Sequence, residues 1–331
     1  MSPDENTDWE ATAQPLAEPR PSAVAAGDYA APPEPSRDYA LAAEPPRPAE
    51  SAWSRFVELV RLEQTVFALP FAYIGMFLAA GGWPGFKTFV WVSLAMVGAR
   101  TAGMTANRII DMEIDGANPR TSDRALPAGR MAPRTAGVLM VASFCLLGLA
   151  AQQLNPLCFK LAPLAVVLLL GYSYLKRLTW ACHLGLGLVQ ACAPLGGWLA
   201  VSGRFEAAPF FLASAIFLWV GGFDILYACQ DIDHDRAHGL HSIPARLGIR
   251  KAFQVSRMFH FTAVAALAMA GWVLGLSGIY YTGVGLVGAI LVWEQNILTP
   301  EDLSRMQHAF FVANAAVSLT LLVAVLLEVL W

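Results

Sequence analysis

Charged side chains are scarce in this sequence of 331 residues. Asp, Glu, Lys and Arg make up only 14% of it, whereas a soluble domain carries about a quarter. Hydrophobic residues account for 56%, which indicates a chain that crosses a membrane several times. There is no excess of basic residues, since the formal net charge is -3, and nothing therefore indicates a nucleic-acid partner.

Cysteine is also rare and unpatterned. The five cysteines form no C-x-x-C pair and show no Cys/His spacing that would hold zinc. We interpret them as small apolar side chains.

Long apolar runs are absent from residues 1–52, which are rich in Pro, Ala and Glu. This segment begins with acidic residues, where a signal peptide would have a basic flank and then an apolar stretch. We predict a disordered cytoplasmic tail at 1–52 and a membrane domain at 53–331.

From residue 53 onward, apolar runs are long enough to cross a lipid bilayer. They predict an all-α, multi-pass membrane bundle of about nine transmembrane helices, at 64–82, 86–108, 134–154, 157–175, 181–202, 207–228, 252–274, 276–293 and 307–330. Turn sequences such as N-P at 155–156 separate these runs. The weakest separator is G-L-S-G at 275–278, and eight helices are the alternative.

Lys and Arg concentrate in the loops after the second, fourth and sixth predicted helices, whereas the opposite side carries only Lys87, Lys160 and Arg204. The positive-inside rule places the basic loops in the cytoplasm. We therefore expect a protein of the plasma membrane whose active site faces the cytoplasm.

Two polar clusters interrupt the apolar sequence at this basic side. The first, N-R-I-I-D-M-E-I-D, contains Asn107, Asp111 and Asp115, and the second, D-I-L-Y-A-C-Q-D-I-D-H-D, contains Asp224, Asp231 and Asp235. Steps of four and seven residues place each set along one helix face. A solvated helix end could produce one such stripe by chance, but two at the same membrane side are harder to explain that way. Carboxylates at the ends of membrane helices are costly, so we interpret the pair as a functional site.

Mg2+ suits this site because it is commonly held by one or two carboxylates together with phosphate oxygens. Asp111, Asp115, Asp231 and Asp235 are the predicted catalytic metal ligands, acting partly through a diphosphate. Arg120, Arg124 and Lys176 lie in the adjoining loops, where they could neutralise a leaving diphosphate. The alternative for these three cations is that they only set the membrane topology.

The motifs resemble the UbiA-type intramembrane prenyltransferases, of the 4-hydroxybenzoate polyprenyltransferase group. The matching stretches are A-R-T-A-G-M-T-A-N-R-I-I-D-M-E-I-D, P-R-T-S-D-R-A-L-P-A-G, Y-S-Y-L-K-R-L-T and F-D-I-L-Y-A-C-Q-D-I-D-H-D, and the resemblance covers about 53–331. It implies a helical bundle around a central cavity, Mg2+ as the cofactor, and a polyprenyl diphosphate and an aromatic acid as substrates.

The resemblance also implies residue roles. The motif residues that would hold Mg2+ and the diphosphate are Asn107, Asp111, Asp115, Asp231 and Asp235. Other matched positions expected to bind substrate are Tyr172, Lys176, Asp224, Tyr227 and Arg100. Arg100 would bind the acceptor carboxylate or a diphosphate oxygen, and its alternative role is an interhelical hydrogen bond.

Some positions depart from the ubiquinone-pathway members. The first helix reads R-L-E-Q-T-V-F-A-L-P-F-A in place of a K-P-I-G-type opening, and His238 and His241 stand where Lys is usual. Both features resemble a branch associated with menaquinone made by the futalosine route, whose acceptor is a dihydroxynaphthoate. The acceptor therefore stays open between 4-hydroxybenzoate and 1,4-dihydroxy-6-naphthoate, with homogentisate, haem or a lipid as alternatives.

Two other classes fit the sequence less well. A secondary transporter should show an internal repeat and charges along a pathway, whereas these acids lie at one membrane level. A CDP-alcohol phosphotransferase would have D-G-x-x-A-R before its aspartates, and this string is absent. His183, Gln190 and Glu294 are interpreted as hydrogen-bond partners between helices rather than as catalytic groups.

Overall fold

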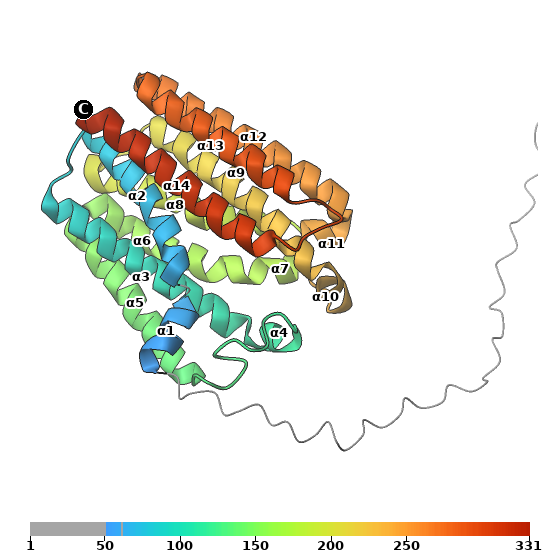
Figure 1. The fold of residues 1–331 in the computed structure, drawn as a ribbon. Helices are drawn as coiled ribbons and strands as arrows, with labels where there is room; N and C mark the ends of the chain where they lie inside the picture. Colours follow the sequence, from blue (N-terminus) through green and yellow to red (C-terminus); the bar gives the residue numbers. More distant parts are fainter. Residues whose placement is uncertain (1–50, 61) are drawn as a thin grey trace, which may run out of the picture. The chain divides into compact units, whose positions relative to one another are not determined.

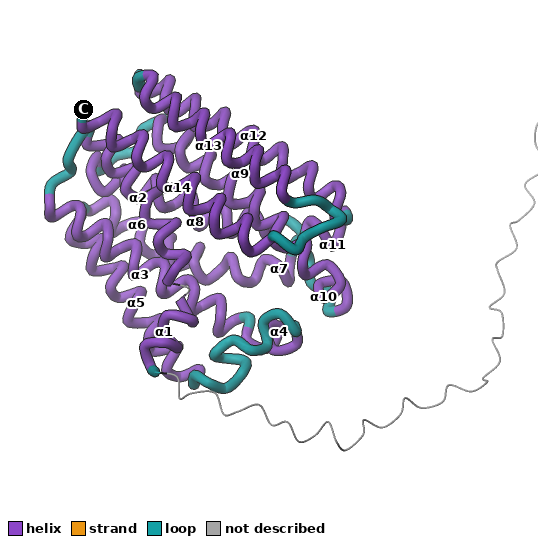
Figure 2. The backbone as a smooth tube through the Cα atoms, in the orientation of Figure 1, coloured by secondary structure: helices purple, strands orange, loops and turns teal. Residues whose placement is uncertain are grey.

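The computed structural model describes residues 51–60 and 62–331, so the predicted tail lies almost entirely outside the described residues. The described part of the chain consists of helices joined by short loops and contains no β-strand (Figures 1 and 2). The predicted all-α class is confirmed.

Each predicted membrane segment corresponds to one long helix in the described chain. These helices are α2 (Leu62–Ala80), α3 (Phe86–Ile110), α5 (Pro133–Leu154), α6 (Pro156–Gly171), α8 (Cys182–Ser202), α9 (Ala208–Ala228), α12 (Ile249–Leu274), α13 (Gly278–Ile297) and α14 (Met306–Leu330). Within the described residues, seven helical segments are long and apolar enough to cross a membrane. They do not include α13, and α2 contributes only the shorter apolar stretch Ala68–Ala80. The count of nine transmembrane helices thus stays a prediction.

Helix ends follow from local sequence. The α6 helix begins at Pro156, and the side chain of Asn155 accepts a hydrogen bond from the backbone N–H of Cys158 at 3.0 Å. The α12 helix ends at Leu274 and is capped by Gly275, whose φ of 65° is left-handed, and the Ser277 side chain then caps α13. The structure therefore separates α12 from α13 at the G-L-S-G sequence.

The α8 helix packs against both α2 and α9, while α3 packs on α5 and α9 on α12. Contact between α2 and α8 requires glycine on both sides. A Cβ atom at Gly75 would overlap the carbonyl oxygen of Pro194, and one at Gly197 would overlap that of Ala72. Glycine allows the two backbones to approach each other this closely.

Short helices gather at one end of the bundle. They are α1 (Ala52–Val60), α4 (Met112–Ala117), α7 (Leu175–Leu178), α10 (Ile232–Ala237) and α11 (Ile243–Leu247), with 3-10 turns η2 (Tyr172–Tyr174) and η3 (Cys229–Asp231). Figure 1 shows α4, α7, α10 and α11 toward the same end of the long helices. Since α4 follows α3 and α10 follows α9, this arrangement brings both aspartate motifs to that end.

Candidate active site

Asp111 and Asp231 lie where the helices of the two motifs are interrupted. Asp111 separates α3 from α4 with φ -95° and ψ 8°, and Asp231 precedes α10 with φ -109° and ψ 10°. Both residues adopt the sparsely populated region between α and β conformations, where many active-site residues are found. The expectation of one uninterrupted helix through each stripe is therefore wrong at these two carboxylates.

The two motifs converge on one cavity of about 330 Å³ at this end of the bundle. All of the residues predicted for the site line it: Arg100, Asn107, Asp111, Asp115, Arg120, Arg124, Tyr172, Lys176, Asp224, Tyr227, Asp231 and Asp235. The geometry thus unites segments that lie more than a hundred residues apart in the sequence, since Arg120 and Asp231 are 111 positions apart.

The Asp111 carboxylate is buried and contacts two cations. The Nζ atom of Lys176 lies 3.3 Å from its Oδ2, and Nη1 of Arg177 lies 2.9 Å from its Oδ1. The amide of Asn107 donates a hydrogen bond to Oδ2 at 2.9 Å and another to Ser173 Oγ at 3.2 Å. Asn107 therefore orients the Asp111 carboxylate, and the sequence motif alone did not specify this role of Asn107.

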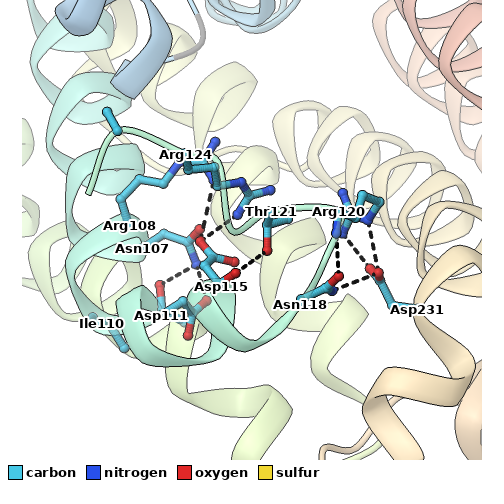
Figure 3. A network of polar contacts seen from close by, with 12 residues as sticks. Asn107, Arg108, Ile110, Asp111, Asp115, Asn118, Arg120, Thr121, Arg124 and Asp231 are labelled. Carbon is cyan, nitrogen blue, oxygen red and sulfur yellow. Dashed lines mark hydrogen bonds and ion pairs between the residues drawn. The ribbon is translucent and has the colours of Figure 1, made fainter. Parts of the chain in front are cut away.

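Asp115 is also buried and paired with arginine (Figure 3). Arg124 Nη1 donates a hydrogen bond to its Oδ2 at 2.6 Å, and Arg108 Nη1 lies 3.6 Å from the same oxygen. Thr121 Oγ1 donates to the main-chain oxygen of Asp115 at 2.9 Å. These contacts fold the basic loop after α4 back over the first motif.

Arg120 joins this loop to the second motif. Its Nε donates to Asp231 Oδ1 at 2.9 Å and its Nη2 lies 2.5 Å from Oδ2, which is the bidentate geometry that arginine favours with carboxylates (Figure 3). Asn118 Nδ2 donates to the same Oδ1 at 3.1 Å. Burial opposes the charged form of Arg120, but the hydrogen bond and charge of Asp231 raise the pKa of its guanidinium above the ordinary value.

Asp235 and Tyr227 of the second motif are held by hydrogen bonds to other parts of the chain. Ser242 Oγ donates to Asp235 Oδ2 at 2.8 Å. The hydroxyl of Tyr227 accepts hydrogen bonds from Gln307 Nε2 at 3.2 Å and from Arg120 Nη1 at 3.4 Å. Tyr227 thus links α9 both to α14 and to the loop that covers the first motif.

Asp224 is paired with His183, which is buried at the start of α8. His183 Nδ1 lies 2.6 Å from Asp224 Oδ2, and the backbone N–H of Ile243 donates to His183 Nε2 at 3.3 Å. Because Nε2 accepts, Nδ1 carries the hydrogen that is donated to Asp224. His183 is a site residue that sequence reasoning set aside, and its link to Asp224 spans 41 positions.

Arg108, Asn118 and Arg177 were also missed as site residues, although all three contact a predicted carboxylate. Arg108 and Asn118 lie inside or next to the first motif, so a sequence signal existed for them. Arg177 belongs to the Y-S-Y-L-K-R-L-T stretch, in which only Tyr172 and Lys176 were predicted as site residues. Its bond from Nη2 to the Ile110 main-chain oxygen at 2.8 Å depends on how the segment around Arg177 lies against the end of α3.

The donor set fits Mg2+ that is held jointly with a substrate. Every predicted ligand is a hard oxygen donor, and Asp111 Oδ1 is buried without a hydrogen bond, although Arg177 lies close to it. Among the described residues, no three His, Cys, Asp or Glu side chains form a ready-made metal cage. Mg2+ commonly takes several of its ligands from phosphate oxygens and water.

Glu58 fixes the covering loop to α1. Its carboxylate accepts hydrogen bonds from the backbone N–H of Ala125 at 2.9 Å and from both terminal nitrogens of Arg130 at 2.7 and 2.8 Å. We expect Glu58→Ala to lower the free energy of unfolding by about 1–3 kcal/mol, since it leaves hydrogen-bonding groups without a partner. Thermal unfolding of purified protein in detergent measures this effect.

Glu301→Ala is the matched control for Glu58→Ala. Glu301 pairs with Arg250 at 3.1 Å, but the two side chains are 65% and 82% exposed. Such surface pairs contribute about 0–1 kcal/mol, so the unfolding temperature should hardly change. Equal destabilisation by the two substitutions would show that the Glu58 contacts do not anchor the loop.

Comparison with known proteins places these observations in a family context. The model of the UbiA prenyltransferase family matches residues 68–315. A 4-hydroxybenzoate octaprenyltransferase of Aliivibrio fischeri is 29% identical over 273 residues, covering 80% of this chain and 92% of that protein. The apo structure of a UbiA homolog from Aeropyrum pernix K1 is 34% identical, with a TM-score of 0.75 and coverage of 82% and 99%. A UbiA homolog from Archaeoglobus fulgidus bound to GPP and Mg2+ shares the fold at 19% identity, with a TM-score of 0.62 and coverage of 82% and 99%.

Proposed function

The chain belongs to the UbiA prenyltransferase family, and from this premise we propose that it transfers a polyprenyl group from an allylic diphosphate to the ring of an aromatic acid in quinone biosynthesis. Membership makes it a prenyltransferase and a multi-pass integral membrane protein. The observation that carries the proposal is the single cavity on which two acidic motifs and their basic loops converge. The name of the Aliivibrio fischeri relative, a 4-hydroxybenzoate octaprenyltransferase, supports an aromatic acid as the acceptor.

We assign Mg2+ to four carboxylates of the cavity, those of Asp111, Asp115, Asp231 and Asp235. When bound, the ion would stabilise negative charge on the leaving diphosphate. The Archaeoglobus fulgidus homolog, described as bound to GPP and Mg2+, supports this assignment. The same end of the bundle carries the basic loops, and we infer that it faces the cytoplasm at the plasma membrane.

The cations of the site exchange partners when the donor binds. Arg120 and Lys176 now contact Asp231 and Asp111, and both line the cavity. On donor binding, their N–H groups turn to diphosphate oxygens and stabilise the charge that develops as the allylic C–O bond breaks. Arg124, which now contacts Asp115, turns to the diphosphate in the same way.

Carbon–carbon bond formation requires a proton acceptor. The ring of the aromatic acid attacks the allylic carbon, the diphosphate leaves, and the ring carbon that has formed the new bond must lose its hydrogen as a proton. Asp224 lines the cavity with its Oδ2 fixed by His183, and its carboxylate takes that proton to become a carboxylic acid. Arg100, on the same cavity wall, binds the carboxylate of the acceptor.

Two acceptors satisfy this arrangement, 4-hydroxybenzoate and 1,4-dihydroxy-6-naphthoate, because each has a carboxylate for Arg100 and an electron-rich ring. The Aliivibrio fischeri relative favours the first. His238 and His241 favour the second, since they stand where the ubiquinone-type enzymes usually have Lys.

Purified protein supplied with geranyl diphosphate, Mg2+ and each acid in parallel tests the proposal. We expect one prenylated acid by mass spectrometry and loss of product when EDTA removes divalent ions. Product from only one acid assigns the acceptor. If neither acid gave Mg2+-dependent product, the aromatic-acid proposal would fail, and homogentisate, haem precursors and lipid alcohols would be the next acceptors to assay.

A further inference from the structure

Two polar groups deep in the active-site cavity have no partner in the described part of the chain. Trp219 on α9 and Asn314 on α14 line this cavity and are only 4% and 2% exposed. The indole Nε1 of Trp219 and the amide Oδ1 of Asn314 are buried without a hydrogen bond to any described residue. Burying such groups is costly unless they are hydrogen-bonded, so we looked for a ligand that satisfies both.

Contacts between α9 and α14 define this part of the cavity wall. Gln307 at the start of α14 donates a hydrogen bond to the Tyr227 hydroxyl near the end of α9 at 3.2 Å. The two helices therefore run in opposite directions from this contact (Figure 1). About one turn away from it, the rings of Phe223 and Phe310 lie with their centroids 5.2 Å apart, so the helices stay side by side along the cavity.

Trp219 and Asn314 occupy the next turn of the same two helices. Trp219 lies four residues from Phe223, and Asn314 lies four residues from Phe310. Each step corresponds to about 6 Å along a helix axis. The indole and the amide therefore lie at the same depth in the cavity.

Arg100 on α3 lines the cavity at a similar depth. It precedes Asp111 by 11 residues, and Trp219 precedes Asp231 by 12 residues. Both side chains thus start about 16–18 Å from these aspartates along their helices. An acid whose carboxylate binds Arg100 can place its ring at the level of Trp219 and Asn314.

The two groups without partners have complementary hydrogen-bonding chemistry. The indole N–H of Trp219 only donates, whereas the Oδ1 atom of Asn314 only accepts. A carboxylate only accepts and an ammonium group only donates, so neither of these satisfies both atoms. A hydroxyl group satisfies both, because its oxygen accepts one hydrogen bond and its O–H donates another. Rotation of the Asn314 amide about χ2 can orient its oxygen toward such a group.

We propose that Trp219 and Asn314 recognise the ring hydroxyl of the aromatic acid and make the enzyme specific for hydroxylated rings. This inference rests on the proposed function, because it takes an aromatic acid as the acceptor. Trp219 donates to the hydroxyl oxygen, and Asn314 accepts the hydroxyl hydrogen. With the carboxylate on Arg100, the ring is held at both ends, which fixes the ring carbon that faces the allylic carbon.

Three benzoates that differ only at the 4-position separate the two hydrogen bonds. 4-Hydroxybenzoate can make both of them. 4-Aminobenzoate can donate to Asn314, but its nitrogen lone pair is delocalised into the ring and accepts poorly from Trp219. 4-Fluorobenzoate cannot donate, and its fluorine is a poor acceptor, while its carboxylate and ring remain available to Arg100 and the cavity.

Trp219→Phe removes the indole N–H, and Asn314→Leu replaces the amide by an apolar side chain of similar size. Ser318→Ala is the matched control on α14, since Ser318 lies four residues beyond Asn314, donates to the Ala315 main-chain oxygen at 3.1 Å and does not line the cavity. Trp272→Phe is the control for the indole, because Trp272 on α12 is exposed and does not line the cavity either.

The test measures binding of each acid to purified protein with Mg2+ and geranyl thiolodiphosphate, an unreactive analogue of the donor. Wild-type protein and both controls should bind 4-hydroxybenzoate about tenfold or more tightly than 4-fluorobenzoate, with 4-aminobenzoate between them. Trp219→Phe should make the affinities for the hydroxy and amino acids equal. Asn314→Leu should bring both within about threefold of 4-fluorobenzoate. The affinity for 4-fluorobenzoate itself should be retained in both variants.

Three results would overturn the inference: equal wild-type affinity for the hydroxy and fluoro acids, an unchanged ratio in both variants, or equal weakening of all three acids. Equal wild-type affinity would leave ordered water as the partner of the two groups, and the proposed acceptor class would stand because the acids bind. The same comparison between 1,4-dihydroxy-6-naphthoate and 2-naphthoate covers the second candidate acceptor. If the protein binds the donor analogue but neither hydroxylated acid, the proposed acceptor class fails, and this inference fails with it.

Discussion

Asp111→Asn and Asp231→Asn are each expected to lower prenyl transfer by about 10³-fold, because each removes a negative charge from the cluster that we assign to Mg2+ and the diphosphate. The amide has nearly the same shape as the carboxylate, so the cavity itself should persist. Asp111 is the partner of Lys176 and Arg177, and Asp231 is the partner of Arg120. The two substitutions should therefore lower prenyl transfer by changing the charge of the site and not its volume.

Asp233→Asn is the control for these two variants. Asp233 lies between Asp231 and Asp235 in the sequence, but it is exposed and does not line the cavity. Its activity should stay within about twofold of wild type, as expected for a surface substitution away from the site. Product formation at saturating donor and acceptor, with Mg2+ titrated, is the measurement. Full activity in either cavity variant, or an equal loss in Asp233→Asn, would refute the assigned metal site.

Much of the site was predictable because a membrane sequence makes polar residues conspicuous. Asp111 and Asp224 follow apolar runs, and the four-residue steps from Asp111 to Asp115 and from Asp231 to Asp235 indicate which acids share a helix face. The structure brings all of the predicted residues to one cavity. The apolar runs also predicted the long helices to within a few residues, and several helix ends coincide with Pro, Gly or Asn.

Contacts between distant segments were not predictable in the same way. His183 pairs with Asp224, Asn118 with Asp231, and Glu58 with Arg130. Each pair depends on which helices pack together, and one sequence contains no direct signal of that packing. The interruptions at Asp111 and Asp231 were missed for a related reason, because neither position has the Gly or Pro that commonly marks a break.

The paired carboxylates explain how the site is stable before substrate binds. Three buried or half-buried aspartates, Asp111, Asp115 and Asp231, each contact at least one cationic side chain. Unpaired, these charges would be costly to bury. A bound metal–diphosphate complex supplies both signs of charge, so it can satisfy the carboxylates and the cations at the same time. We therefore propose that donor binding exchanges the ion pairs of Arg120, Arg124 and Lys176 for contacts with the diphosphate.

The second large effect is expected at Asp224. Asp224→Asn cannot accept a proton, so kcat should fall by about 10²–10⁴-fold, the usual contribution of a general base. In wild-type protein, loss of the ring proton follows bond formation and should be fast, so an acceptor deuterated at the ring carbon that is prenylated should react at the same rate as the undeuterated acid. In Asp224→Asn, proton loss becomes slow, and a primary isotope effect should emerge.

His183 supplies the comparison that separates proton transfer from simple positioning. His183→Leu removes the hydrogen bond that now joins Nδ1 to Asp224 Oδ2 at 2.6 Å, so kcat should fall by about tenfold, with a smaller isotope effect than in Asp224→Asn. His183→Asn should restore part of the activity, because its amide can donate to Asp224 from a similar place. Asp224→Asn could instead lose activity without any isotope effect and with an increased KM for the acceptor. Asp224 would then be an acceptor-binding residue and not the base. That result would leave solvent in the cavity as the proton acceptor, because the other aspartates that line it are the four that we assign to Mg2+: Asp111, Asp115, Asp231 and Asp235.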